Sequence, residues 1–433
     1  MPSVSSAAPV VVEVLAAILL LSAFASIRVL LRGCAVLRRW RRESARPYRD
    51  VLLKSPLVPG VSVVAVVTHG DPDYVPFVRR QLNLEFGERE VVVVLNGASP
   101  RAVETWSEDF HLFQSYRPCG APLATGPVRA VYESKDPIQL VVVDKEAGST
   151  ADAYNAGLNA SSTPYLAVID SEADFEQDTL LRLIVPILED PERTLAVCAG
   201  VPDASEGSLV GRFAEIESLR SWLGRSLAFA GWNALLPTPG QAAIIQRQVI
   251  VRAGGWLAGL PEMFLQLHGY ARKANHAHRI AFLPDPICRP RTVRGFDDLR
   301  RHVAREQQWV GGAIRRLGSI HKGWGALGSW GVLALVWDRF LRPLLETLAY
   351  AATVVALAMG WIGRPLAVLM LLATVVSGIL VSMSAVVMRE LAEYRASDPA
   401  VLTGLFFAAI PENLGYRQLR NLWLIAGFFR NPE

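Results

Sequence analysis

Apolar segments near both ends of the chain limit the folds that it can adopt. Residues 10–27 form an apolar run that only Glu13 interrupts, and this run is long enough to cross a bilayer. Residues 343–387 form a second apolar block with a break at 360–365, so we expect two further spans, at about 343–361 and 365–388. The residues between the two blocks have the composition of a soluble domain. The sequence therefore predicts an N-terminal anchor (1–49), a soluble domain (50–320) and a C-terminal membrane domain with interfacial helices (321–433).

The charge after the first apolar run predicts its orientation. Arginines follow the run at positions 28, 32, 38, 39, 41 and 42, and the positive-inside rule places them, with the soluble domain, in the cytosol. No basic segment precedes the run and no small-residue cleavage site follows it, so we expect a signal anchor. The predicted location is a bacterial-type inner (plasma) membrane, crossed more than once.

The net charge of +4 comes mostly from these arginines. It favours contact with anionic lipid headgroups, and the sequence contains no recognisable nucleic-acid-binding module, so we expect no nucleic-acid partner. The four cysteines are scattered and fit no metal-binding spacing.

Four apolar, mostly β-branched runs predict the sheet of the soluble domain. They cover residues 61–67, 90–95, 139–143 and 165–169, and helical patterns at 150–159 and 178–188 alternate with them. This alternation predicts an α/β fold with a mostly parallel sheet. Residues 100–135 show no strong period, and we expect them to form a peripheral insertion.

Polar or acidic side chains follow each of the four runs. Thr68 follows the first, Asn96 the second, Asp144 the third and Asp170 the fourth. Parallel strands bring their carboxyl ends to one edge of the sheet, where ligands of such folds bind, so these residues predict one shared site.

Asp170 and Glu172 follow the fourth run at positions i and i+2. Both carboxylates could chelate one Mg²⁺ or Mn²⁺ if the turn directs them inward. In the alternative interpretation, Asp170 caps the next helix and Glu172 is solvated.

Several longer segments resemble one known family. They occur in the family's order, at residues 141–160, 164–170, 180–193, 252–256, 279–288, 308–312 and 412–419. Together they resemble the membrane-bound family-2 glycosyltransferases, the group of the cellulose and hyaluronan synthases. The resemblance implies a GT-A (nucleotide-diphospho-sugar transferase) fold, a nucleotide-sugar donor (a UDP-sugar is expected), a divalent metal, and inverting transfer to a membrane-proximal lipid or polysaccharide acceptor.

The resemblance also implies roles for individual residues. Glu262 stands at the position of the general base, and Asp170 and Glu172 stand at the metal-binding positions. The donor-binding positions are Thr68, Asn96, Asp144 and Thr150. The positions that contact the acceptor and the diphosphate are Arg305, Gln308 and Trp309.

Several of these positions differ from the family's pattern. Asn96 replaces an aspartate, Thr150 replaces a lysine, and Glu172 and Glu262 each add a methylene to an aspartate. Two hypotheses follow. In the first, the altered site still functions, and the protein transfers sugar either in polysaccharide synthesis or as a single unit to a lipid. In the second, the chain is a pseudo-glycosyltransferase that serves as scaffold or partner of a companion synthase subunit. In the C-terminal apolar block, we expect Glu346 to pair with Arg339 or Arg342, or to line a polar path.

Overall fold

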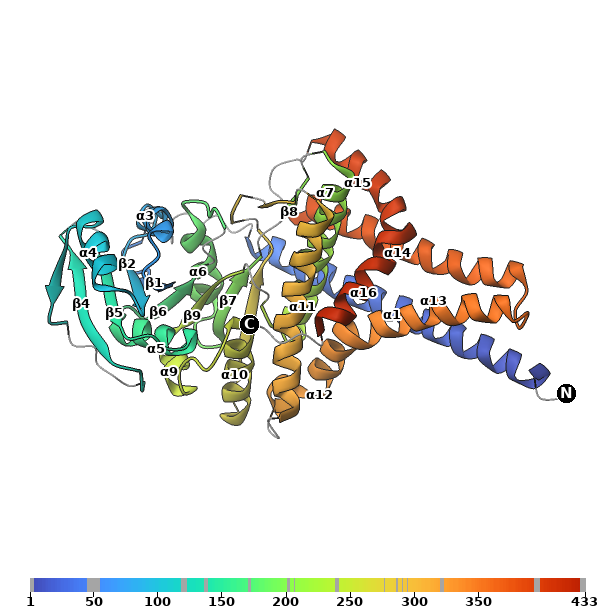
Figure 1. The fold of residues 1–433 in the computed structure, drawn as a ribbon, viewed down its shortest axis with the longest axis horizontal. Helices are drawn as coiled ribbons and strands as arrows, with labels where there is room; N and C mark the ends of the chain where they lie inside the picture. Colours follow the sequence, from blue (N-terminus) through green and yellow to red (C-terminus); the bar gives the residue numbers. More distant parts are fainter. Residues whose placement is uncertain are drawn as a thin grey trace.

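The chain folds into a sheet with helices on both faces, joined to a group of long helices that extend away from it (Figure 1). The computed structural model describes residues 4–44, 55–117, 123–135, 139–169, 173–200, 203–205, 207–237, 241–275, 277–285, 287–289, 291–293, 295–319, 323–392 and 398–428. Within these ranges the strands are β1 (Val61–Thr68), β2 (Arg89–Asn96), β3 (Leu112–Ser115), β4 (Val128–Ser134), β5 (Gln139–Lys145), β6 (Tyr165–Val168), β7 (Thr194–Ala199), β8 (Asp203–Ala204), β9 (Ala242–Gln246), β10 (Arg279–Leu283) and β11 (Arg291–Thr292).

The α-helices are α1 (Val4–Ser44), α3 (Val75–Leu82), α4 (Pro100–Asp109), α5 (Thr150–Ala160), α6 (Thr179–Glu189), α7 (Leu209–Leu219), α8 (Leu227–Gly231), α9 (Arg247–Arg252), α10 (Leu260–Lys273), α11 (Phe296–Ser319), α12 (Gly323–Val336), α13 (Arg342–Ala358), α14 (Arg364–Ala392), α15 (Pro399–Pro411) and α16 (Arg417–Phe428). A 3₁₀ turn, η1 (Pro72–Tyr74), precedes α3. Two π-helical segments of the described residues, η2 (Arg220–Ser226) and η3 (Trp337–Leu341), lie within the longer helices. The segment η4 (Glu412–Tyr416) joins α15 to α16 through a kink at Leu414 and Gly415.

The nine-stranded sheet has the order β10-β7-β9-β6-β1-β2-β5-β4-β3. The four strands that the sequence predicts lie side by side as β6, β1, β2 and β5, and each pairs with its neighbour in parallel. β9 pairs antiparallel with β6 and β7, and β4 pairs antiparallel with β5 and β3. The predicted α/β class with a mostly parallel central sheet is therefore confirmed.

Alternating side chains of the central strands enter two separate cores. Val64, Val92 and Val141 contribute to one core, together with side chains of α5 and α10. Val63, Val91 and Val142 contribute to the other, together with side chains of α3, α4 and α6. Because helices cover both faces, both sets of strand positions are apolar, and this explains the continuous β-branched runs in the sequence.

Residues 100–135 are more integrated than the expected peripheral insertion. They contain α4, β3 and β4, and β4 extends the sheet by pairing with β5 along the register Val131 to Val143. β3 is the edge strand and β4 lies next to it, and the side chains of both are mostly exposed or half-buried, so they do not need to be uniformly apolar. This weak pattern explains why the strands could not be recognised from the sequence.

In the part of the chain that the structure describes, three helices are long and apolar enough to cross a membrane: Glu13–Arg42, Leu327–Ala358 and Arg364–Ala392. They project from the side of the molecule opposite the β3–β4 edge (Figure 1). The predicted break at 360–365 coincides with the end of α13 at Ala358 and the start of α14 at Arg364. The first hydrophobic core continues from the sheet to Leu37 of α1 and Ala385 of α14, so the soluble part and the long helices share one packed interior.

Candidate active site at the carboxyl edge of the sheet

The strand register brings the predicted donor-binding residues to one edge of the sheet. Thr68 pairs with Asn96 across β1 and β2, and Asn96 pairs with Lys145 across β2 and β5. These three residues are the last of their strands and therefore form one row. Asp144 lies one position before Lys145, and Thr150 begins α5 five residues after it.

The Asn96 side chain fixes the loop between β5 and α5. Its Nδ2 donates a hydrogen bond to the Gly148 carbonyl oxygen (2.8 Å), and its Oδ1 accepts one from the Gly148 N–H (2.9 Å). The amide is buried, at 6% exposure. A carboxylate could accept from the N–H but could not donate to the carbonyl oxygen, so this clamp requires the amide of Asn96.

Lys145 supplies a positive charge beneath the same loop, and the sequence-based search missed it. Its side chain is fully buried, and its Nζ donates to the Glu146 carbonyl oxygen (2.8 Å) and to Asp152 Oδ2 (2.5 Å). The Gly126 N–H also donates to Asp152, at 2.8 Å. Burial raises the pKa of Asp152, but the bonds from Lys145 and Gly126 outweigh it, so the net pKa lies below its ordinary value. The signal in the sequence was a lysine that ends an otherwise apolar strand.

Asp144 is held by an arginine from the neighbouring strand β4. Arg129 of β4 forms an ion pair with Asp144 Oδ1 and also donates to the carbonyl oxygen of Ala98 at 2.7 Å. Burial raises the pKa of Asp144, while the hydrogen bond and charge of Arg129 oppose this shift. Thr68 and Thr150 are exposed beside this group, and both could contact a ligand.

Glycine is required where two loops of the edge meet. Gly97 follows Asn96 with φ +73°, and a Cβ at this position would lie 2.8 Å from the Cβ of Ala147. The left-handed backbone and the contact both exclude a side chain at Gly97. The loop after β2 can therefore lie directly against the loop that leads to α5.

Glu262 lies in the first turn of α10 and is 9% exposed. The loop before α10 is attached to α5, because the side chain of Asn155 exchanges two hydrogen bonds with the backbone of Trp256, at 2.7 and 3.0 Å. The Tyr154 and Trp256 rings stack beside these bonds with centroids 4.7 Å apart. Gln266 of α10 holds the other side of the loop through the carbonyl oxygens of Ala253 and Gly255. The start of α10 is thereby connected to the helix that begins at the sheet edge.

The remaining predicted residues are described only in part. Asp170 and Glu172 lie outside the described residues; the strand that precedes them, β6, ends at Val168 beside β1. Arg305 is exposed on α11 and Gln308 is half-buried, whereas the side chain of Trp309 lies outside the described residues. Within the described ranges, no group of three or more His, Cys, Asp or Glu side chains could hold a metal ion.

No model of a known protein family matches the chain, and no curated protein matches its sequence. It is similar to the mannosyltransferase PcManGT from Pyrobaculum calidifontis in complex with GDP-Man and Mn²⁺ (19% identity, 91% of this chain and 99% of that chain, TM-score 0.46). It is also similar to S. aureus TarS 1–349 in complex with UDP-GlcNAc (13% identity, 83% and 92%, TM-score 0.38). A third similar structure is glucosyl-3-phosphoglycerate synthase from Mycobacterium tuberculosis with Mn²⁺, UDP and phosphoglyceric acid (17% identity, 66% and 84%, TM-score 0.34). At these identities and scores, activity and substrate have to be argued from the site itself.

Proposed function

We propose that the protein is a membrane-bound family-2 glycosyltransferase with a GT-A fold that moves a sugar from a nucleotide-sugar, a UDP-sugar by preference, to a membrane-proximal acceptor. The observation that carries this proposal is the row formed by Thr68, Asn96 and Lys145 at the carboxyl edge of parallel strands, next to the start of α5. Ligands of open α/β sheets bind at such edges, and helix N-termini favour phosphate groups. The family resemblance of the sequence supports the same donor class.

Each part of this edge has a proposed role toward the donor. Thr68 and Thr150, which are exposed, would contact the nucleotide directly. Asn96 and Lys145 would act as positioning residues, because their polar atoms already hold the loop that leads to α5. The buried Lys145 ammonium would also contribute positive potential beneath the diphosphate.

The proposed reaction is a single displacement with inversion. Glu262 would accept the proton of the acceptor hydroxyl while the hydroxyl oxygen bonds to the anomeric carbon. The bond from that carbon to the diphosphate oxygen breaks on the opposite face, and the nucleoside diphosphate leaves with its electron pair. Arg305, Gln308 and Trp309 on α11 would hold the acceptor and the diphosphate.

Asp170 and Glu172 would hold a divalent cation, Mg²⁺ or Mn²⁺. Both donors are carboxylates, and oxygen donors are the ligands that these hard cations take, so the donor set fits the ion. When bound, the cation would supply positive charge to the departing diphosphate.

Purified full-length protein in nanodiscs, supplied with UDP- or GDP-sugars and Mn²⁺, tests this proposal. We expect transfer or slow hydrolysis of the donor, and a loss of at least about 100-fold in Glu262→Gln, the range that removal of a general base produces. Asp170→Asn should show a similar loss. Glu192→Gln, an exposed glutamate between α6 and β7, is the matched control and should retain activity. No turnover with any donor, together with no metal-dependent nucleotide binding, would overturn the proposal.

A second candidate function is a pseudo-glycosyltransferase that serves as a scaffold or partner for an active synthase. The observation that favours it is that both amide atoms of Asn96, at a donor-binding position, are engaged with Gly148. Under this hypothesis the protein binds a nucleotide without turnover and co-purifies with a companion glycosyltransferase subunit. Turnover by the isolated chain would exclude it.

A further inference from the structure

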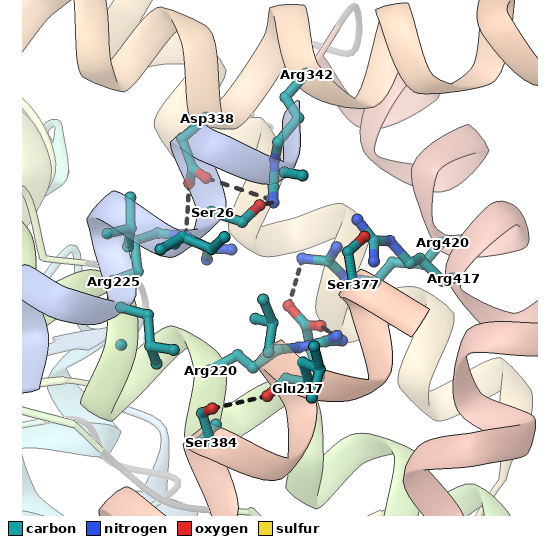
Figure 2. A pocket seen from close by; sticks show the side chains of 18 of the residues that line it. Ser26, Glu217, Arg220, Arg225, Asp338, Arg342, Ser377, Ser384, Arg417 and Arg420 are labelled. Carbon is teal, nitrogen blue, oxygen red and sulfur yellow. Dashed lines mark hydrogen bonds and ion pairs between the residues drawn. The ribbon is translucent and has the colours of Figure 1, made fainter. Parts of the chain in front are cut away.

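A cavity of about 340 Å³ lies where the long apolar helices meet the soluble part of the chain. Its wall is formed by residues of α1, α7, η2, η3, α13, α14 and α16, and it shares no residue with the sheet edge described above. Five arginines line it, whereas its acidic lining consists of Glu217 and Asp338 (Figure 2). The arginines are Arg220, Arg225, Arg342, Arg417 and Arg420, and we call this cavity the arginine pocket.

Several of these charged residues lie on the short segments η2, η3 and η4. η2 contains Arg220 and Arg225, and η3 contains Asp338. Glu412 of η4 forms an ion pair with Arg220 at 2.6 Å. π-Helical turns are rare and occur frequently at functional sites, because the extra residue redirects side chains. Two such turns, η2 and η3, line this cavity, which indicates that the arrangement serves more than the connection of helices.

Carboxylates hold the arginines in place. Asp338 binds Arg225 at 2.7 Å and Arg342 at 3.3 Å, and Glu217 binds Arg220 at 2.6 Å and also Arg420.

Glu346 takes different partners from those expected from the sequence. It forms an ion pair with Arg417 at 3.0 Å and accepts hydrogen bonds from Ser22 and from Asn421. The kink in η4 and the start of α16 bring Arg417 to Glu346, and the sequence gives no sign of this long-range contact.

Positive charge exceeds negative charge in this network. Among the residues that the structure describes, it contains six arginines and five carboxylates: Arg220, Arg225, Arg339, Arg342, Arg417 and Arg420 with Glu217, Glu306, Asp338, Glu346 and Glu412. The network therefore has a surplus of one positive charge. The residues that line the pocket, five arginines and two carboxylates, have a surplus of three. Burying an uncompensated charge is costly, so the pocket favours an anion.

One arginine has a donor that the described residues do not satisfy. Arg420 is 5% exposed and lines the pocket, and its Nη2 binds Glu217. Its Nε is buried and has no hydrogen-bond partner among the described residues. A buried N–H of a charged group without an acceptor is unfavourable, and an anion in the pocket would remove this cost.

The pocket also has an apolar lining. It includes Ala23, Ile27 and Leu30 of α1 and Leu380 and Val381 of α14. Ile27 is 48% exposed and Leu380 is 60% exposed, as expected for side chains that contact lipid tails. A ligand that fits this arrangement has an anionic head and an apolar tail.

We propose that the arginine pocket binds the anionic phosphate headgroup of a membrane lipid, whose chains lie between α1 and α14. Basic pockets between membrane helices on the cytoplasmic side bind lipid phosphates in this way. A phosphate oxygen would accept from Arg420 and from the guanidinium groups around it. The proposal rests on the proposed insertion of α1 and α14 into a membrane, and it is independent of sugar transfer.

Native mass spectrometry of the full chain in detergent, with lipid added, tests the proposal. Phosphatidic acid is the probe, phosphatidylcholine is the net-neutral control, and excess inorganic phosphate is the soluble competitor. We expect at least tenfold tighter binding of phosphatidic acid than of phosphatidylcholine, and no displacement by inorganic phosphate. Equal binding of the two lipids, or displacement by inorganic phosphate, would overturn the lipid assignment.

Two variants locate the site. Ser384→Phe fills the pocket from α14 without touching the ion pairs, and Thr374→Phe places the same ring on that helix outside the pocket. We expect Ser384→Phe to weaken phosphatidic acid binding at least tenfold and Thr374→Phe to leave it unchanged. Arg420→Gln, which removes the guanidinium charge, should show a comparable loss. If Ser384→Phe binds the lipid as the wild type does, the pocket is not the site, whatever the result of the sugar-transfer assay.

Discussion

The side-chain amide of Asn96 exchanges two hydrogen bonds with the backbone of Gly148, at 2.8 and 2.9 Å, and so joins the end of β2 to the loop before α5. Through this contact, Asn96 holds the loop beside the candidate active site. We therefore expect that removal of the Asn96 amide affects both stability and nucleotide binding.

The first prediction concerns this clamp. Asn96→Ala leaves the N–H and carbonyl oxygen of Gly148 without their partner, and we expect a loss of roughly 1–3 kcal/mol in the free energy of unfolding. Nucleotide affinity should fall as well, because the loop beside the site loosens. Asn83→Ala, an exposed asparagine at the end of α3, is the matched control. Equal thermal stability of the two variants would contradict the role given to Asn96.

The second prediction concerns the buried Lys145–Asp152 pair. Lys145→Met should destabilise the fold by about 3 kcal/mol, because Asp152 keeps its charge without its partner. Lys145→Met combined with Asp152→Asn should recover part of that loss, as measured by chemical denaturation. If the double variant loses as much free energy of unfolding as the two single variants lose together, the two side chains are not coupled.

The same pair predicts a dependence on pH. The folded-state pKa of Asp152 lies below its ordinary value of 3.8, so its stabilising contribution is complete above that pH. The contribution is lost as the pH falls through the folded-state pKa. The stability difference between the wild type and Asp152→Asn should therefore be present at pH 7 and should shrink under strongly acidic conditions. A difference that grows on acidification would contradict the assignment.

A third prediction concerns the meeting of the two loops at Gly97. Gly97→Ala forces a left-handed backbone on alanine and places its Cβ against Ala147, so we expect a lower melting temperature and weaker nucleotide binding. Gly87→Ala is the control, since a Cβ at Gly87 would meet no atom within 4 Å. Equal behaviour of the two variants would show that the loops can separate without consequence.

A fourth prediction concerns His268, which packs against His278 in the interior of the soluble part. Its Nδ1 lies 3.0 Å from His278 Nε2, and its Nε2 lies 3.1 Å from the Leu235 carbonyl oxygen. Burial, and then the nearby His278, lower the pKa of His268 to about 3 from 6.5. Below pH 6.5 the unfolded chain gains a proton that the folded chain does not, so stability falls as the pH drops toward 3.

Removing this histidine should make the free energy of unfolding depend less on pH under acidic conditions. We expect His268→Gln to show a weaker loss of stability between pH 6.5 and 4 than the wild type, in denaturant titrations at each pH. His111→Asn, at an exposed position with φ +50°, should keep the wild-type slope. An unchanged slope in His268→Gln would show that other groups dominate the acid response.

The central sheet could be predicted from the sequence because its strands are buried on both faces. β1, β2, β5 and β6 are rich in buried Val, Leu and Ala, and their shared edge follows from parallel pairing, whereas the sequence did not predict their order in the sheet. β4 was missed because only Val131 among its seven positions is buried, and Arg129, which it brings to Asp144, was missed with it. A strand whose side chains are mostly exposed or half-buried carries too weak a period to be recognised in isolation.

The candidate site was predictable by position and less so by interaction. Thr68, Asn96 and Asp144 could be selected because they follow predicted strands. The sequence could not show that Asn96 binds Gly148 or that Lys145 is buried beneath the loop. Such contacts depend on loop geometry, and the arginine pocket depends on pairs such as Arg417–Glu346 that are distant in sequence. A charged residue in an apolar block indicates that an oppositely charged partner exists, but the sequence does not identify that partner.

Nucleotide binding by the full-length chain tests the central claim most directly. Isothermal titration with UDP and with GDP, with and without Mn²⁺, measures whether the edge formed by Thr68, Asn96 and Lys145 is a nucleotide-sugar site. We predict binding of one nucleoside diphosphate that Mn²⁺ strengthens at least tenfold and that Asp170→Asn and Gly97→Ala each weaken. Absence of binding to either nucleotide, or binding that ignores both Mn²⁺ and these substitutions, would contradict the account.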